Sequence, residues 1–272
     1  MKVIKFPNLI NEKNTTIILG SFSMFHLGHL DLLKIAKNEK QKIVLFIFDK
    51  PEKLPNKTNL IFEQLSVRLQ KAANLNIDYS IIIETKKENV FLSAKEFINK
   101  LKQYNPLKII CGNDYKFGHN AKGNIDLLKK YFDVDAVKPV KINNIKISSS
   151  IIKEQISFGE IKFCNSLMTE PWTIKVNMKS NNTFELEKEQ VKPHNGIYAI
   201  TLELKSILYH GVCSVNKGIF KLKLLNYKLK IIPQNSIVVI RWIQEIKISI
   251  NEIDNKITQE QMEFANKLFK KT

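Results

Sequence analysis

The sequence predicts an α/β domain with a mostly parallel sheet, followed by a small antiparallel β-barrel domain with a C-terminal helix. From residue 16 to about residue 140, short β-branched runs alternate with amphipathic segments, which is typical of βαβ units. After Glu170-Pro171-Trp172, strand-like runs follow one another with only turn residues between them, which favours a barrel or sandwich. The total of 272 residues is enough for two cores. We place the boundary near Thr169, which gives domains 1–169 and 170–272.

Strands and helices alternate through the first domain. We expect strands at residues 17–19, 43–48, 81–83, 108–111 and 134–140. Helical spacing of apolar residues occupies the intervals around residues 30–36, 65–72, 97–101 and 127–131. Ser93 and Glu96 form a capping box, which predicts a helix that begins directly after Ser93.

The second domain contains four clear strand-like runs and one final helix. The runs cover residues 196–202, 207–212, 220–225 and 237–242. Residues 258–271 place Met262, Ala265 and Phe269 along one helical stripe, with Phe264 and Leu268 beside it. We expect this helix to pack on the barrel.

Composition narrows the class of protein. No run reaches the roughly 18 to 20 apolar residues that a membrane span needs, and the N-terminus lacks a signal-like apolar run. We therefore expect a cytoplasmic protein without a membrane partner. Cys111, Cys164 and Cys213 are widely spaced and odd in number, which indicates reduced cysteines that fill small apolar spaces.

The formal net charge of +17 raises the question of a polyanionic partner. Arg68 and Arg241 are the only arginines, and the excess lysine is scattered along the chain. A solvated basic surface and a real preference for polyanions both remain open. No aromatic interleaving or known reading motif accompanies the charge, so nucleic acid is not favoured as a partner.

The motif with the clearest chemistry follows the first predicted strand. Gly20 ends that strand, and His26-Leu27-Gly28-His29 leads directly into a helix. Glycines allow a close backbone approach, and a helix N-terminus offers free N–H groups and a positive dipole end to phosphate. Two histidines three residues apart can donate hydrogen bonds to phosphate oxygens. Adenylyl transfer needs mainly this positioning and charge neutralisation, although a histidine pair alone can also be an ordinary helix start.

This sequence resembles the prokaryotic bifunctional riboflavin kinase and FAD synthetase family, within the wider group of His-x-Gly-His nucleotidyltransferases. The wider motif fixes the reaction type but not the substrate. Four further segments are similar to family motifs and occur in the same chain order. They are Phe46-Ile-Phe-Asp-Lys-Pro51, Phe91-Leu-Ser-Ala-Lys-Glu-Phe97, Gly112-Asn-Asp-Tyr-Lys-Phe-Gly118 with Lys122-Gly123, and Ile147-Ser-Ser-Ser-Ile-Ile-Lys153.

The resemblance implies a Rossmann-like nucleotidyltransferase domain that joins FMN to ATP and releases FAD and pyrophosphate, with Mg²⁺ as cofactor. It assigns catalytic roles to His26, His29 and Lys153. Its other implied residues are the phosphate-binding Gly20, Phe22, Gly28, Asp114, Ser149 and Ser150, and the flavin-binding Phe48, Pro51 and Phe117. No metal ligand is identified, and a monomer or weak homo-oligomer is expected.

Some of these residues also have simpler roles. The serines before residue 151 form a natural helix N-cap, which can itself serve an anion. Asp114 and Phe117 can be a turn residue and a core residue.

The chain also departs from the family pattern. Ser23 and Met24 stand where the family has Asp and Gly, and Ala121 and Lys153 stand where it has arginines. A lysine offers a point charge but not a bidentate fork.

The barrel departs further. Pro193-His-Asn-Gly-Ile-Tyr-Ala199 resembles a family strand, but the Pro-Thr-Ala-Asn motif is absent, and Lys221 aligns with the catalytic glutamate of the kinase. Lysine cannot act as that carboxylate base. We therefore expect a barrel that is inactive as a kinase. The alternatives are a bifunctional enzyme with unrecognised kinase motifs, a transferase for another phosphate acceptor, or a non-catalytic flavin- or nucleic-acid-binding protein.

Overall fold

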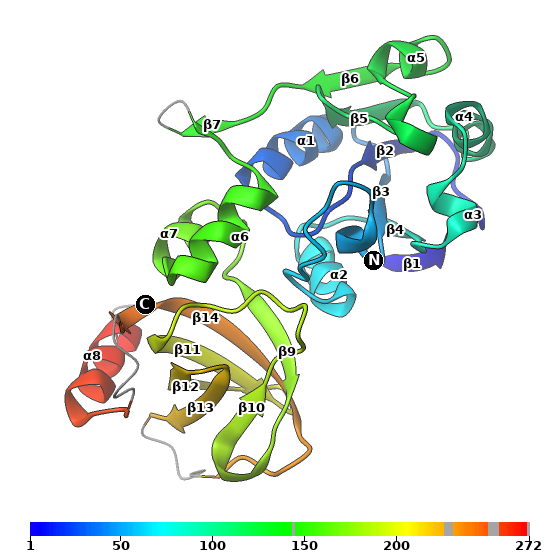
Figure 1. Ribbon diagram of the computed structural model, residues 1–272. Coiled ribbons are helices and arrows are strands. Elements are labelled where there is room, and N and C mark those ends of the chain that lie inside the picture. Colours follow the sequence, from blue (N-terminus) through cyan, green and yellow to red (C-terminus); the bar gives the residue numbers. More distant parts are fainter. Residues whose placement is uncertain (143–144, 226–230, 250–255, 271–272) are drawn as a thin grey trace. The chain divides into compact units, whose positions relative to one another are not determined.

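The computed structural model describes residues 1–142, 145–225, 231–249 and 256–270 (Figure 1). The chain divides into two compact units, residues 1–60 with 68–148, and residues 61–67 with 149–272. This division differs from the boundary predicted near Thr169. Residues 149–169 belong with the C-terminal unit, as does the short segment 61–67 from the first half of the chain.

The first unit contains a six-stranded sheet in which all the pairs are parallel. Its strands, in spatial order, are β1 (Lys2–Lys5), β4 (Tyr79–Ile83), β3 (Ile43–Phe48), β2 (Thr16–Leu19), β5 (Lys108–Gly112) and β6 (Val134–Val137). The predicted parallel sheet is confirmed. The sequence did not predict β1, and β6 ends at Val137 rather than at Val140.

Helices connect these strands, and four of them lie where the periodicity predicted them, whereas the short helix Lys87–Val90 was not predicted. They are α1 (Leu27–Asn38), α2 (Leu65–Asn74), α3 (Lys87–Val90), α4 (Ala94–Gln103) and α5 (Ile125–Lys129), with short 3₁₀ turns η1 (Pro51–Lys53) and η2 (His119–Ala121) and a hairpin of β7 (Lys141–Ile142) and β8 (Ile145–Lys146). The Ser93 capping box is confirmed. Ser93 Oγ accepts the Glu96 N–H at 3.2 Å, and Glu96 Oε2 accepts the Ser93 N–H at 2.8 Å.

The strand order identifies where a ligand can bind. From β2 the chain moves outward through β3 and β4, and it then returns to the other side of β2 to form β5. This reversal creates a topological switch point at the carboxyl end of β2, where open α/β sheets bind their ligands. The turn that contains Gly20 and the two histidines begins at this end.

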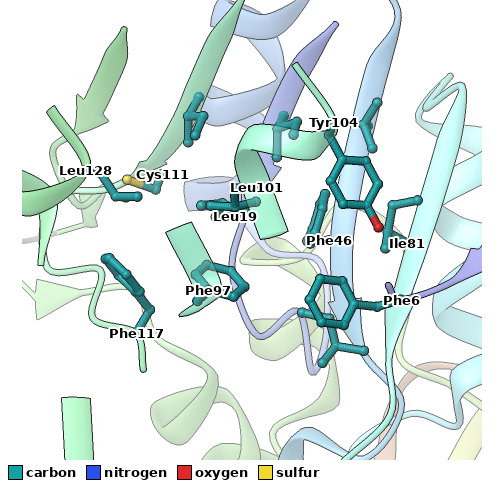
Figure 2. Close-up of a cluster of buried hydrophobic side chains, with 14 of the residues drawn as sticks. Phe6, Leu19, Phe46, Ile81, Phe97, Leu101, Tyr104, Cys111, Phe117 and Leu128 are labelled. Carbon is teal, nitrogen blue, oxygen red and sulfur yellow. The ribbon is translucent and has the colours of Figure 1, made fainter. Parts of the chain in front are cut away.

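Both faces of the central strands β2, β3 and β5 of the parallel sheet are buried. Alternate residues such as Ile17, Leu19 and Phe46 face one core, and their neighbours are buried on the other face. Figure 2 shows the first core, in which Phe97 and Leu101 of α4 lie beside Leu19 and Phe46 of the sheet. A sheet that is covered on both sides offers its strand ends, rather than its faces, to ligands.

The second unit contains a six-stranded antiparallel sheet that forms a nearly closed barrel, as predicted. Its strands, in spatial order, are β10 (Thr183–Glu185), β13 (Ile219–Leu224), β12 (Ile207–Asn216), β11 (Gly196–Leu204), β14 (Ile237–Ile248) and β9 (Thr173–Asn177). The 3₁₀ turn η3 (Ser180–Asn182) precedes β10. The sequence did not predict β9 and β10, and it ended β12 and β14 too early.

The described residues of this unit also form three helices: α6 (Ser149–Phe158), α7 (Ile161–Ser166) and α8 (Gln259–Lys270). The predicted closing helix is confirmed, because Met262 and Ala265 of α8 are buried in one cluster with Ile197 and Val212 of the barrel. Inside the barrel the rings of Trp172 and Trp242 stack with centroids 5.2 Å apart.

The segment 61–67 is bonded into the barrel through its backbone and side chains. Gln64 donates to the Lys175 carbonyl at 3.0 Å and accepts the Lys175 N–H at 3.1 Å. The Trp172 indole N–H donates to the Phe62 carbonyl at 3.0 Å. These bonds explain why residues 61–67 belong to the second unit although α2 continues into the first.

The cysteine prediction is confirmed, since Cys111, Cys164 and Cys213 are all free and buried. In the part of the chain that the structure describes, no helix has the length and apolar character needed to cross a membrane.

Candidate active site

The turn after β2 is built around two glycines whose missing side chains leave room for aromatic rings. A Cβ on Gly20 would lie 2.7 Å from the ring of Phe22, and a Cβ on Gly28 would lie 3.1 Å from the ring of His26. We expected these glycines to make room for a ligand. In the structure they make room for the rings of Phe22 and His26, which pack against the backbone of the turn at these two glycines.

Phe22 adopts an unusual backbone conformation in this turn. Its φ is 46°, in the left-handed region that bulky residues rarely occupy. Its ring is 2% exposed and lies 5.6 Å from the ring of Phe25 and 4.8 Å from that of His29, measured between centroids. Such strain persists only where the surroundings fix it, and it concentrates at functional sites.

His26 and His29 form a stacked pair at the N-terminus of α1. His26 is the N-cap residue, and the two ring centroids are 3.8 Å apart with an interplanar angle of 18°. The His26 N–H donates to Nδ1 of His29 at 3.3 Å. Because Nδ1 of His29 accepts this bond, the proton of the neutral ring is carried by Nε2, which is left as a donor.

Both histidines are held in the neutral form. Burial lowers the pKa of His26 to about 4, and the positive charge of Lys146 acts in the same direction. Burial also lowers the pKa of His29 well below its usual value, and the neighbouring His26 adds to this. Nδ1 of His26 is buried and has no hydrogen-bond partner among the described residues. An arriving anion would reverse these effects, since negative charge favours a protonated ring.

Asp114 lies in the loop after β5 and pairs with Lys146. The Lys146 ammonium donates to Oδ2 of Asp114, and this hydrogen bond holds the pKa of the carboxyl below its ordinary range. Lys146 also acts electrostatically on His26, so one lysine links the predicted aspartate to the histidine turn. Sequence reasoning missed Lys146, although its position directly before the Ile147-Ser-Ser-Ser segment was a usable signal.

Arg68 is a second residue that sequence reasoning missed. It lies in α2, is 1% exposed, and donates to the carbonyl of Phe22 in the histidine turn and to two carbonyls at the end of β3. The sequence did offer a sign of Arg68. It is one of only two arginines in the chain, and it lies among the apolar helical positions 65, 69 and 72.

The predicted flavin-binding residues lie near the end of β3 and after β5. Pro51 is buried as the first residue of η1, and Phe48 packs partly buried against the core shown in Figure 2. Phe117 is 7% exposed and lies 5.4 Å from Phe97 between ring centroids. Its packing agrees with the simpler role of a core residue, and its contact with flavin stays a prediction.

Ser149, Ser150 and Lys153 lie in the first half of α6, so a helix does begin at the serines. This helix belongs to the second compact unit. The roles of these three residues toward a triphosphate stay predictions.

The departures from the expected motif have clear structural positions. Met24 is fully buried, whereas Ser23 is partly exposed in the turn. Ala121 has a φ of 55° in the loop after Phe117. Among the described residues no group of three or more His, Cys, Asp or Glu could hold a metal ion. The turn therefore does not provide a carboxylate cage of the kind that Mg²⁺ prefers.

Comparisons with known proteins identify the family of this chain. The family model described as FAD synthetase matches residues 9–151. The chain is 29% identical to the bifunctional riboflavin kinase/FMN adenylyltransferase of Buchnera aphidicola from Acyrthosiphon pisum, over 75% of this chain and 73% of that protein. It is 26% identical to a putative enzyme of the same description from Geobacillus thermodenitrificans, over 59% of this chain and 92% of that protein.

One solved structure is similar over nearly the whole length of both chains. It is described as a macrolide-efflux protein from Streptococcus pneumoniae and aligns with a TM-score of 0.80 and 22% identity, covering 100% of this chain and 98% of that one. At this identity the likeness shows the fold alone.

Proposed function

The chain belongs to the FAD synthetase family, since the family model matches residues 9–151 of its 272, and we propose that it makes FAD from FMN and ATP. A phosphate oxygen of FMN attacks the α-phosphorus of ATP. The bond from that phosphorus to the bridging oxygen breaks, and pyrophosphate leaves with the electron pair. No covalent enzyme nucleophile is needed, so the protein acts by positioning and by stabilising charge.

One observation carries this proposal: a stacked, neutral histidine pair lies at the N-terminus of α1, at the switch point of a parallel sheet. Free backbone N–H groups and the positive end of the helix dipole favour an anion there. The pair lies within the residues that the family model matches.

The histidines contribute donors whose strength increases with the charge of the reacting phosphates. Nε2 of His29 carries a proton, because its Nδ1 accepts the His26 N–H. The polyphosphate brings negative charge toward rings whose pKa values are lowered in the free protein. That charge raises both pKa values, which strengthens the hydrogen bonds as pyrophosphate departs.

Lys146 and Asp114 add a charged pair beside the turn. Lys146 neutralises Asp114 in the free protein, and an incoming phosphate competes for the same ammonium. We assign Lys153, Ser149 and Ser150 to the triphosphate, and Phe48, Pro51 and Phe117 to the flavin side. Mg²⁺ supplies charge neutralisation on the phosphates when it is bound with ATP. The turn contributes imidazoles rather than carboxylates, so we expect phosphate oxygens and water to be the ligands of Mg²⁺.

The barrel is proposed to lack kinase activity. Lys221 is exposed on β13, where it pairs with Ser214 of β12 and Thr183 of β10. An ammonium at this position cannot take a proton from a riboflavin hydroxyl as a carboxylate does. The three buried cysteines suit a reducing, cytoplasmic compartment.

The test is incubation of the protein with FMN, ATP and magnesium, followed by chromatography for FAD and an assay for pyrophosphate. We expect both products in equal amounts. Parallel incubations with phosphopantetheine, nicotinate mononucleotide or choline phosphate in place of FMN should release no pyrophosphate. Release with one of these acceptors and none with FMN would reassign the substrate. No release with FMN or with any of the other acceptors would indicate a non-catalytic binding protein.

A bifunctional enzyme is the second candidate, because the two relatives above are named for both activities. Incubation with riboflavin, ATP and magnesium separates the two candidates. We expect no FMN. Clear formation of FMN would show that kinase chemistry persists in the barrel.

A further inference from the structure

We infer that Arg68 is a positioning residue that fixes the histidine turn relative to the end of β3, an inference that rests on the proposed adenylyl transfer. We propose that Arg68 acts through the backbone of two segments, which carry the proposed phosphate-binding and flavin-binding residues.

Arg68 joins these segments with three hydrogen bonds to backbone carbonyls. Its Nη1 donates to Phe22 O at 3.1 Å and to Phe48 O at 2.8 Å, and its Nη2 donates to Asp49 O at 2.6 Å. The side chain is 1% exposed, so these bonds form away from water. A planar guanidinium can hold carbonyls in two directions at once, which a lysine ammonium does less rigidly.

The three carbonyls lie at or just beyond the carboxyl ends of two neighbouring parallel strands, where the ligand is proposed to bind. Phe22 follows β2, Phe48 is the last residue of β3, and Asp49 follows β3, which pairs with β2. Buried carbonyls that lie beyond the last hydrogen bond between two strands need hydrogen-bond donors from elsewhere in the protein. Arg68 supplies these donors and ties the two strand ends together.

The bond to Phe22 also supports the strained part of the turn. Phe22 has a φ of 46°, and its ring lies against His29. Without the Arg68 donor, relaxation of Phe22 would move the ring on which His29 rests. The end of β3 has a further anchor, because the Asp49 carboxylate accepts bonds from the N–H and hydroxyl of Thr85. The histidine turn is therefore the segment that depends most on Arg68.

Two arginine variants provide the test. Arg68→Met keeps the length and apolar stem of the side chain but removes its donors. Arg241→Met is the matched control, since Arg241 pairs with Glu203 in the barrel. We measure kcat and KM for ATP, FMN binding by quenching of flavin fluorescence, thermal stability, and amide hydrogen exchange of residues 20–29.

For Arg68→Met we expect kcat to fall by about 100-fold, the usual cost of a misplacement of about 1 Å, while FMN affinity changes by less than about 3-fold. Exchange of residues 20–29 should rise by about 10-fold. Arg68→Lys should recover part of kcat, and Arg241→Met should match the wild type. Unchanged kcat and exchange in folded Arg68→Met, or equal effects in both methionine variants, would overturn the inference. If the wild type makes no FAD, the proposed function fails, and the exchange measurement still decides whether Arg68 fixes the turn.

Discussion

The two units differ in which polar and aromatic side chains they bury. In the first unit, the ends of β2 and β3 hold a stacked histidine pair with lowered pKa values, a phenylalanine with positive φ, and a buried arginine. In the second, the residue aligned with a kinase base is an exposed lysine, whereas the interior is filled with stacked aromatic rings. Local strain and costly burial of polar groups accompany a reaction site, while regular apolar packing accompanies a scaffold. We therefore propose that the histidine turn of the first unit contributes to the chemistry, whereas the barrel of the second unit has a structural role.

The largest expected effect is on barrel stability. Phe220 is fully buried, stacks with Phe184 at 4.8 Å between centroids, and contacts Trp242 edge-on at 6.1 Å. Phe220→Ala should lower the free energy of unfolding of the barrel by about 3 to 5 kcal/mol, because it leaves a cavity. Urea unfolding followed by tryptophan fluorescence measures this, since both tryptophans lie in the barrel unit. A change below about 1 kcal/mol would contradict the packing described.

The next effect is on catalysis. His29→Ala should lower kcat for FAD formation by about 10²- to 10³-fold, or about 2.7 to 4 kcal/mol, because it removes one donor to the developing charge. The control is His194→Ala, an exposed histidine of the barrel unit. Equal losses in the two variants would remove the distinction between a chemical unit and a scaffold.

The third effect is a pH dependence of stability. His26 has a pKa of about 4 in the folded protein against 6.5 for the ordinary group, so the unfolded chain binds more protons between these values. Stability from the neutral ring is complete above pH 6.5 and is lost as the pH falls toward 4. Between pH 7.5 and 4.5 this loss should be about 2 to 3 kcal/mol.

Denaturant unfolding of the wild type and of His26→Gln at both pH values isolates this contribution. The variant lacks the titrating ring of His26, so its stability should fall less than that of the wild type over the same pH interval. A wild-type pH dependence equal to that of His26→Gln would show that His26 keeps an ordinary pKa.

The smallest effect is expected at the barrel position that aligns with a kinase base. Lys221→Met should change stability by less than about 0.5 kcal/mol, as is usual for exposed residues, and should leave FAD formation unchanged. Riboflavin phosphorylation that is present in the wild type and absent in this variant would give Lys221 a chemical role.

Much of the fold could be predicted because it depends on local patterns. The alternation of apolar runs predicted the parallel sheet, and the capping box located the start of α4 at Ala94. Strand β1 was missed because its four residues are mostly exposed and gain their structure by pairing with β4, which lies far along the chain. Segment 61–67 was missed for the same reason, since its partners lie in the barrel.

The candidate site shows the same limit. The histidine motif is contiguous, so the sequence indicated it together with its helix. Arg68 donates a hydrogen bond to the carbonyl of Phe22, 46 residues away. Every residue has a backbone carbonyl, so the sequence does not indicate which one Arg68 binds. The histidine pKa values follow from burial, which spacing alone does not reveal.

The most direct test of the central claim is a histidine NMR titration of the full chain with ATP, FMN and magnesium. The chain has five histidines, and spectra of His26→Gln and His29→Gln assign two of the ring signals. We predict that ATP shifts these two signals and raises the pKa values of His26 and His29, while the ring signals of His194 and His210 stay in place. Shifts confined to other histidines, with the pair unmoved at saturating ATP, would contradict the account.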